Sequence, residues 1–314
     1  MTDALTPPPV ATTTVDALPR RGWAMGLICV SSLAISFGGL IMRNIEVADA
    51  WQVNFYRGLS FMAAIATILL IQYRGRTWHR VRRIGRPGLV GGVLLAIAGL
   101  AFVQSLTLTT VANALFTLGA IPFFTAALAW VFLREALRPI TATTMLIAGA
   151  GIVVMVGGGI GGGSILGNLL ALLTALSFSA FAVIVRRHRD IDMLPALLVS
   201  GLVILAVTTA AKSGDLDIPW RDMALCFVWG GVLSGLANWL FVVASRHLVA
   251  AEVTLFMMLE FTFGPLWVWL FIGETPSGWT LAGGALILAA VLIRALIELR
   301  DQAPKLRRGR PSPG

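Results

Sequence analysis

Charged residues are scarce in this sequence. Only 12% of its 314 residues are Asp, Glu, Lys or Arg, whereas 57% are hydrophobic, and the mean hydropathy is +0.86. A soluble domain carries about 25% charged residues, because water must wet its surface. The composition therefore excludes an ordinary soluble protein and indicates that most of the surface faces a lipid bilayer.

The residues that build disulfides, metal centres and catalytic clusters are also few. Both cysteines lie inside apolar segments, the three histidines lie outside them, and neither an HExxH nor a GxSxG motif occurs. The glycine run at 157–163 lacks the following Lys-Ser/Thr of a phosphate-binding loop. We therefore expect no catalytic residues, no metal site and no cofactor, and a membrane-embedded enzyme is a disfavoured alternative.

Long apolar stretches occupy nearly the whole chain. Each is close to the roughly 20 residues that a helix needs to cross a bilayer, and only helices satisfy their backbone groups within such a segment. The sequence predicts an all-α integral membrane protein with ten transmembrane helices, at 22–42, 51–72, 88–108, 111–133, 139–157, 165–185, 193–211, 223–244, 251–272 and 279–297.

Basic residues alternate between the connections of these ten spans. One side collects most of the Lys and Arg, whereas the other receives only Arg43, Lys212 and Arg221, and Arg57 lies within a span. Cytoplasmic loops carry the excess of Lys and Arg, so we expect both termini in the cytoplasm. The net charge of +9 then follows from topology and not from nucleic-acid binding. Residues 1–21 are expected to be a disordered cytoplasmic tail and 299–314 a basic cytoplasmic tail.

The chain contains an internal repeat. Residues 111–137 align with 250–276, which superimposes Trp130 on Trp269 and Glu135 on Glu274. These segments include the fourth and ninth spans, so each half holds five spans and the second half runs inverted relative to the first. We expect one five-helix repeat at 22–158, a Gly-rich linker at 159–164 and a second repeat at 165–298. Inverted repeats are common in secondary transporters.

Several segments resemble the EamA-type transporters of the drug/metabolite transporter superfamily. They are residues 34–61, with an Arg in the second span, WVFLRE at 130–135, and LEFTFGPLWVWLFIGE at 259–274; the resemblance covers roughly 22–298. In that family an intramembrane Glu precedes the terminal Glu of the ninth span by fourteen residues, which here is Glu260. Many members have Pro directly after it, whereas this chain has Phe261 there and Pro265 instead, so we expect a helix break one turn later.

Ionisable residues inside a bilayer require a partner or a water-filled cavity. Glu260 either binds a substrate ammonium group or couples transport to protons, or it is a structural acid that bonds to neighbouring helices. For Arg57 a structural role is favoured over binding a substrate carboxylate, and an ion pair with Glu260 is an open alternative. Glu252 shares the helix face of Glu260 but lies near the span end, where it could extend to the interface. Further candidates are the polar or aromatic span residues Asn54, Gln104, Asn113, Asn238 and Trp239. For any one of these, a helix–helix hydrogen bond is favoured over ligand contact.

The resemblance implies a secondary transporter that exports or takes up small organic metabolites such as amino acids. We expect an exporter in the bacterial inner membrane. We expect alternating access around a central cavity, with protons as a candidate coupling ion and a monomer or weak dimer as the assembly. Export of amphipathic drugs is an alternative, and a channel or scaffold is the alternative of another class.

Overall fold

The computed structural model describes residues 17–73, 77–134, 139–158, 165–188, 191–237, 239–240, 244 and 250–308, and these residues form helices and connections without any strand. The helices are α1 (Ala17–Ser36), α2 (Gly38–Asn44), α3 (Ala50–Tyr73), α4 (Thr77–Arg83), α5 (Gly85–Leu108), α6 (Val111–Leu118), α7 (Ile121–Leu133), α8 (Pro139–Gly158), α9 (Ile165–Arg187), α10 (Ala196–Ala211), α11 (Trp220–Phe227), the π-helix η2 (Val228–Leu236), α13 (Ala250–Ile272) and α14 (Gly278–Arg308).

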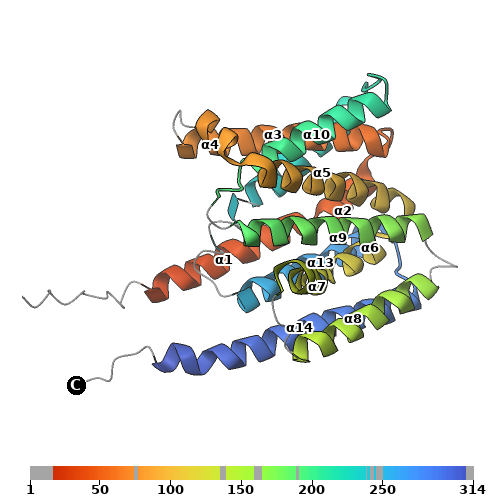
Figure 1. Ribbon diagram of the computed structural model, residues 1–314. Helices are drawn as coiled ribbons and strands as arrows, with labels where there is room; N and C mark the ends of the chain where they lie inside the picture. Colours follow the sequence, from red (N-terminus) through yellow and green to blue (C-terminus); the bar gives the residue numbers. More distant parts are fainter. Residues whose placement is uncertain are drawn as a thin grey trace, which may run out of the picture.

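The long helices lie side by side in layers. Figure 1 shows α3 and α10 along one side of the bundle, α8 and α14 along the opposite side, and α5, α9 and α13 between them. The first residues of α1, the short helix α4 and the last residues of α14 all lie at one end of the bundle, at the left of Figure 1. We call the opposite end the distal end.

Length and composition allow six helical segments of the described chain to cross a membrane. They are Gly22–Asn44, Ala50–Tyr73, Gly85–Leu108, Val111–Leu133, Ile165–Arg187 and Gly278–Ile297, and shorter apolar helices occur at Pro139–Met155, Ala196–Ala211 and Phe256–Ile272. Large apolar side chains cover their outer faces: Leu146 is 77% exposed, Ile71 72% and Val153 70%. An all-helical chain with such a surface is an integral membrane protein.

Two of the expected spans are interrupted. The first is divided into α1 and α2 at Phe37, and the fourth into α6 and α7 at Gly119 and Ala120. At the second break, Pro122 enters the first turn of α7, where a missing backbone N–H is tolerated. Hydropathy cannot reveal such breaks, because the residues on either side of them are as apolar as those of an unbroken span.

The expected helix break near Pro265 is wrong, because α13 runs from Ala250 to Ile272 with this proline inside it. Helices also reach into both expected tails, since α1 begins at Ala17 and α14 continues to Arg308. A helix satisfies its own backbone in water as it does in lipid, so it need not end where the apolar segment ends.

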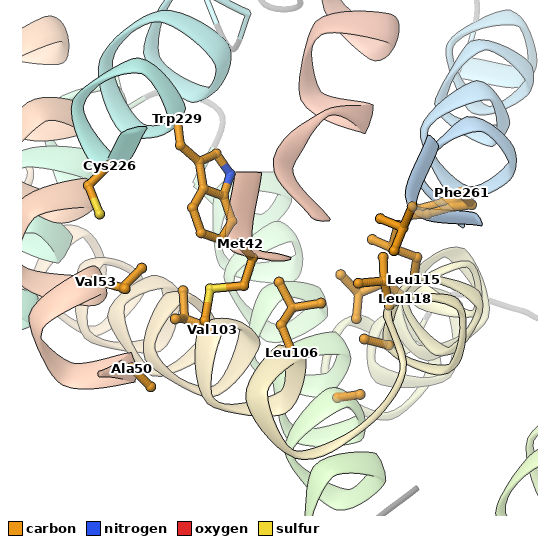
Figure 2. Packing of buried hydrophobic residues seen from close by; sticks show 14 residues of the cluster. Met42, Ala50, Val53, Val103, Leu106, Leu115, Leu118, Cys226, Trp229 and Phe261 are labelled. Carbon is orange, nitrogen blue, oxygen red and sulfur yellow. The ribbon is translucent and has the colours of Figure 1, made fainter. Parts of the chain in front are cut away.

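The central apolar cluster joins helices from both halves of the chain. It includes Val53 of α3, Val103 of α5, Leu115 of α6, Trp229 of η2 and Phe261 of α13. In Figure 2 the Trp229 indole points towards Met42 and Val103, while Leu115, Leu118 and Phe261 form a second group beside it. Lipid tails are as apolar as these side chains, so the contacts stabilise the bundle mainly through close packing.

Helices α8 and α14 approach each other at glycines. A Cβ placed on Gly151 would lie 2.7 Å from the carbonyl oxygen of Gly283, which is closer than real Cβ atoms come. Small residues at such a crossing let two backbones touch, as is common for helices packed in membranes.

Candidate functional site

Arg57 lies in the third turn of α3 and faces the π-helix η2. Its guanidinium carbon is 4.8 Å from the centroid of the Trp229 ring, which is a cation–π contact. Its Nε is buried and has no hydrogen-bond partner among the described residues. The guanidinium therefore stacks on an aromatic face inside the bundle, with no counter-ion among the described residues.

The close approach of η2 to α3 depends on Gly230. A Cβ on Gly230 would collide with the carbonyl oxygen of Arg57 and with the hydroxyl of Ser60. Because Gly230 follows Trp229 directly, this backbone contact holds the indole beside the Arg57 side chain. At this point α11 continues into the nine-residue π-helix η2, and π segments within helices are often found at functional sites.

Two side-chain amides, one on α3 and one on α5, have one end unpaired among the described residues. Asn54, one turn earlier on α3, is fully buried and donates through Nδ2 to the Leu100 carbonyl of α5 at 3.4 Å, while its Oδ1 has no partner among the described residues. Gln104, one turn after Leu100, has a buried Nε2 that is likewise unpaired there. Phe102, on the same helix, packs edge-on against Trp229 with ring centroids 6.4 Å apart. We call Asn54, Arg57, Gln104 and Trp229 the Arg57 cluster: Arg57 contacts Trp229, and the bond from Asn54 joins α3 to α5, on which Gln104 lies one turn after Leu100.

Glu260 lies elsewhere, on the face of α13 that runs along α1. One turn before it, Phe256 packs against a cluster that includes Ile28 of α1. Two turns after it, Trp267 donates to the Ser36 hydroxyl at 2.9 Å and stacks on Phe37 at 5.1 Å. Within the described residues Glu260 forms no hydrogen bond, and it makes no ion pair with Arg57.

Asn113 belongs to a buried hydrogen-bond network at the distal end. Its Nδ2 donates to the hydroxyl of Thr109 at 3.2 Å and to Asn168 Oδ1 of α9 at 3.4 Å, and its Oδ1 accepts from Thr280 of α14 at 2.6 Å. These bonds join α6, α9, α14 and the residue that caps α5, and they leave the amide of Asn113 satisfied. Side-chain hydrogen bonds of this kind commonly join helices in membranes.

The structure describes less of the other three candidates. Asn238 lies outside the described residues, and Glu252 lies in the first turn of α13 with its side chain outside the described part. Trp239 is 41% exposed, so its ring lies on an outer surface of the described chain.

An ion pair at the distal end was not among the predicted site residues. Arg43 Nε donates to Glu274 at 2.6 Å, and its Nη atoms donate to the carbonyls of Leu106 and Thr109, at 2.6 and 3.0 Å. The other Glu274 oxygen accepts from the backbone N–H of Val111 at 2.8 Å. The cation thus caps the C-terminus of α5 and the anion caps the N-terminus of α6, as the helix dipoles favour. We call this pair the latch.

Arg43 could have been found from sequence as one of the few basic residues on the sparsely charged side. Glu274 could have been found because it ends the internal repeat motif and matches Glu135 of the first copy. Their pairing could not, because 231 residues separate them.

Further charged residues bind the loop between α2 and α3, which also lies at the distal end. Asp222 accepts backbone N–H bonds from Val47 and Ala48 at 2.9 Å each, and Arg221 pairs with Glu46. Burial alone would raise the pKa of Asp222, but these backbone bonds and the Arg221 charge lower it below the ordinary value. Partial burial alone would raise the pKa of Asp49. The hydrogen bonds from Lys212 and from nearby backbone N–H groups outweigh this effect, so the pKa of Asp49 is also lowered.

Comparison with known proteins decides the family. The sequence pattern of the EamA-like transporter family matches residues 22–157 and, a second time, residues 165–295. The chain belongs to the EamA-like transporter family. The resemblance predicted from sequence is thereby confirmed, and so is the expectation that this family member is a transporter and not an enzyme.

Relatives of this EamA-family chain carry small molecules across membranes. It is 30% identical to a riboflavin transporter of Rhizobium johnstonii, over 72% of each chain, and 25% identical to the pseudopaline exporter CntI of Pseudomonas aeruginosa, over 74% of this chain and 83% of the exporter. It is 22% identical to human solute carrier family 35 member G1, over 91% of this chain and 82% of that protein. A solved structure with 19% identity has a TM-score of 0.63 and covers 89% of this chain and 99% of its own, which shows a shared fold.

Proposed function

We propose that this chain is a secondary transporter that exports small organic metabolites such as amino acids across the bacterial inner membrane. The observation that carries the proposal is the Arg57 cluster: a cation and two amides with unpaired atoms, inside the helix bundle of an EamA-family protein. Buried polar groups are nearly always satisfied in a folded protein. A solute that completes their hydrogen bonds would give these groups a function.

The topology belongs to the proposal. We assign ten spans, with the helix formed by α11 and η2 as the start of the eighth, and both termini in the cytoplasm. In support, α1 begins and α14 ends at the same end of the bundle, where α4 also contributes Arg82 and Arg83. The distal end holds Arg43, Lys212 and Arg221, the sparsely charged set. The distal end would then face the periplasm.

We further assign two inverted halves, residues 22–158 and 165–298, joined by the linker at 159–164 and flanked by the tails 1–21 and 299–314. The helix contacts support this, because they occur in corresponding pairs. Helix α7 packs on α9 as α13 packs on α1, and α5 packs on α10 as η2 packs on α3. The corresponding helices α3 and α10 run in opposite directions in Figure 1, as do α8 and α14. An inverted relation requires these opposite directions.

In this arrangement the latch and the Asp222 contacts tie the distal end together. Alternating access would break them when the distal end opens, while corresponding contacts form at the other end. No ATP-binding motif occurs in the sequence, so a gradient of substrate or protons supplies the energy. Glu260, which has no partner among the described residues, is our candidate for the coupling proton or for a substrate ammonium group.

Flux through purified protein in liposomes tests the proposal. We expect saturable uptake and counterflow of amino acids or other metabolites, whereas a channel would show neither saturation nor counterflow. Glu260→Gln should lower transport by at least about tenfold while the protein stays folded. Glu46→Gln, at an exposed distal position, is the matched control. Normal flux in Glu260→Gln would refute the role of Glu260, and absence of any solute flux would refute the transport proposal.

A further inference from the structure

The positive charge of Arg57 has no balancing charge within the described structure. Only two acidic residues, Glu252 and Glu260, lie inside the ten expected spans, and both are on α13. Helix α13 packs on α1, α2, α6 and α14, whereas Arg57 faces η2 from α3. A lone cation at this depth is unfavourable unless an anion or water accompanies it.

The surroundings of Arg57 are suited to a small organic anion. Trp229 and Phe102 supply two aromatic rings, and Trp229 covers one face of the guanidinium. Asn54 and Gln104 each offer an amide end that has no partner among the described residues. The unpaired Gln104 Nε2 can donate to an anion, whereas the unpaired Asn54 Oδ1 accepts and suits an N–H or O–H group of the same molecule.

The geometry favours a carboxylate over a phosphate. A guanidinium binds a carboxylate through two parallel hydrogen bonds in one plane, and its unpaired Nε is one of the donors that such a pair uses. A phosphate monoester carries about −1.5 to −2 charges at neutral pH, and Arg57 is the sole cation of the cluster among the described residues.

We propose that the transported substrate carries a carboxylate group, which binds Arg57 beside the Trp229 ring. Gln104 donates to this substrate, and Asn54 accepts from an N–H or O–H group of it. This inference rests on the proposed function and deepens it, because it names the group that the transporter recognises. The sequence favoured a structural role for Arg57; the lack of an acidic partner among the described residues favours the alternative role, binding a substrate carboxylate.

Matched acids and amides test the proposal directly. The probes are 3-phenylpropionate against 3-phenylpropionamide, L-phenylalanine against L-phenylalaninamide, and L-leucine against L-leucinamide. Their dissociation constants are measured by calorimetry on the purified full-length protein. At least one acid should bind about 10- to 100-fold more tightly than its amide, because only the acid forms charged hydrogen bonds. Equal binding within every pair, or no binding by any acid, would overturn the proposal.

Variants then assign the discrimination to Arg57. Arg57→Gln should bind acid and amide equally, and Arg57→Lys should retain part of the preference, because lysine keeps the charge but not the paired donors. Arg221→Gln, an exposed arginine at the distal end, is the control and should keep the full preference. If Arg57→Gln fails to fold, Arg57→Lys decides the matter. An unchanged acid preference in Arg57→Lys would overturn the assignment.

Transport separates this inference from the proposed function. Saturable flux at equal rates for each acid and its amide would support the proposed function and refute the carboxylate site. Acid-selective binding lost in the Arg57 variants, without flux of any solute, would support the site and refute the transport proposal.

Discussion

The latch offers the sharpest test of how the distal end is held together. Arg43 and Glu274 are separated by 231 residues, and their side chains are only 23% and 20% exposed. We expect that replacing either residue by Gln destabilises the protein and that the two changes are strongly non-additive. The reason is that Gln at 274 leaves the Arg43 cation unpaired, and Gln at 43 leaves both the Glu274 carboxylate and the α5 carbonyls less satisfied.

The expected coupling energy between Arg43 and Glu274 follows from the burial of their side chains. Hydrogen bonds to charged groups contribute about 1.5–3 kcal/mol when they are shielded from water, and exposed ion pairs contribute much less. With about four-fifths of each side chain covered, we expect a coupling energy of about 1.5–3 kcal/mol. Arg221 and Glu46 form the matched control pair at the same end, with side chains 50% and 67% exposed, and should show no measurable coupling.

A double-mutant cycle measures the coupling. The free energy of unfolding is determined for the parent, both single variants and the double variant by reversible denaturation in mixed micelles, and the same four measurements are made for the control pair. If the latch couples no more strongly than the exposed pair, the capping of α5 and α6 by these charges does not stabilise the bundle, and the reasoning fails.

Three further predictions concern packing and charge. Gly230→Ala should lower the free energy of unfolding by about 1–3 kcal/mol, because its Cβ would collide with α3. The control is the adjacent Gly231→Ala, whose Cβ would lie 3.6 Å from its nearest neighbour. Equal losses of stability in the two variants would contradict the packing argument. Asn113→Ala should lower the free energy of unfolding by about 1–3 kcal/mol, because it leaves the buried side chains of Asn168 and Thr280 without their bonds to Asn113. The same denaturation experiment measures this loss. Asp222 has a lowered pKa in the folded protein, so its stabilisation is present above the unfolded pKa and is lost as the pH falls through the folded pKa. The stability of the parent should therefore decrease below about pH 4, and Asp222→Asn should be less stable at neutral pH and less sensitive to acid; parallel pH profiles would contradict this.

Part of the candidate site could be predicted from sequence. Arg57 and Glu260 are conspicuous because charge is rare in apolar segments, and Asn54 and Gln104 stand out for the same reason. Their grouping could not be predicted, since it depends on which helices touch. Arg57 meets Trp229, 172 positions further along the chain, and no local pattern encodes that contact.

The sequence by itself determines that this protein lies in a membrane, that its segments are helical and that its chain holds a repeated family pattern. These properties follow from composition and periodicity, because a bilayer admits few kinds of segment. Only the tertiary structure decides where the apolar spans break, that Arg43 joins Glu274, and that Arg57 and Glu260 stand apart without a mutual ion pair. These properties depend on side-chain packing between distant helices, in which one apolar residue differs from another by shape and not by hydropathy.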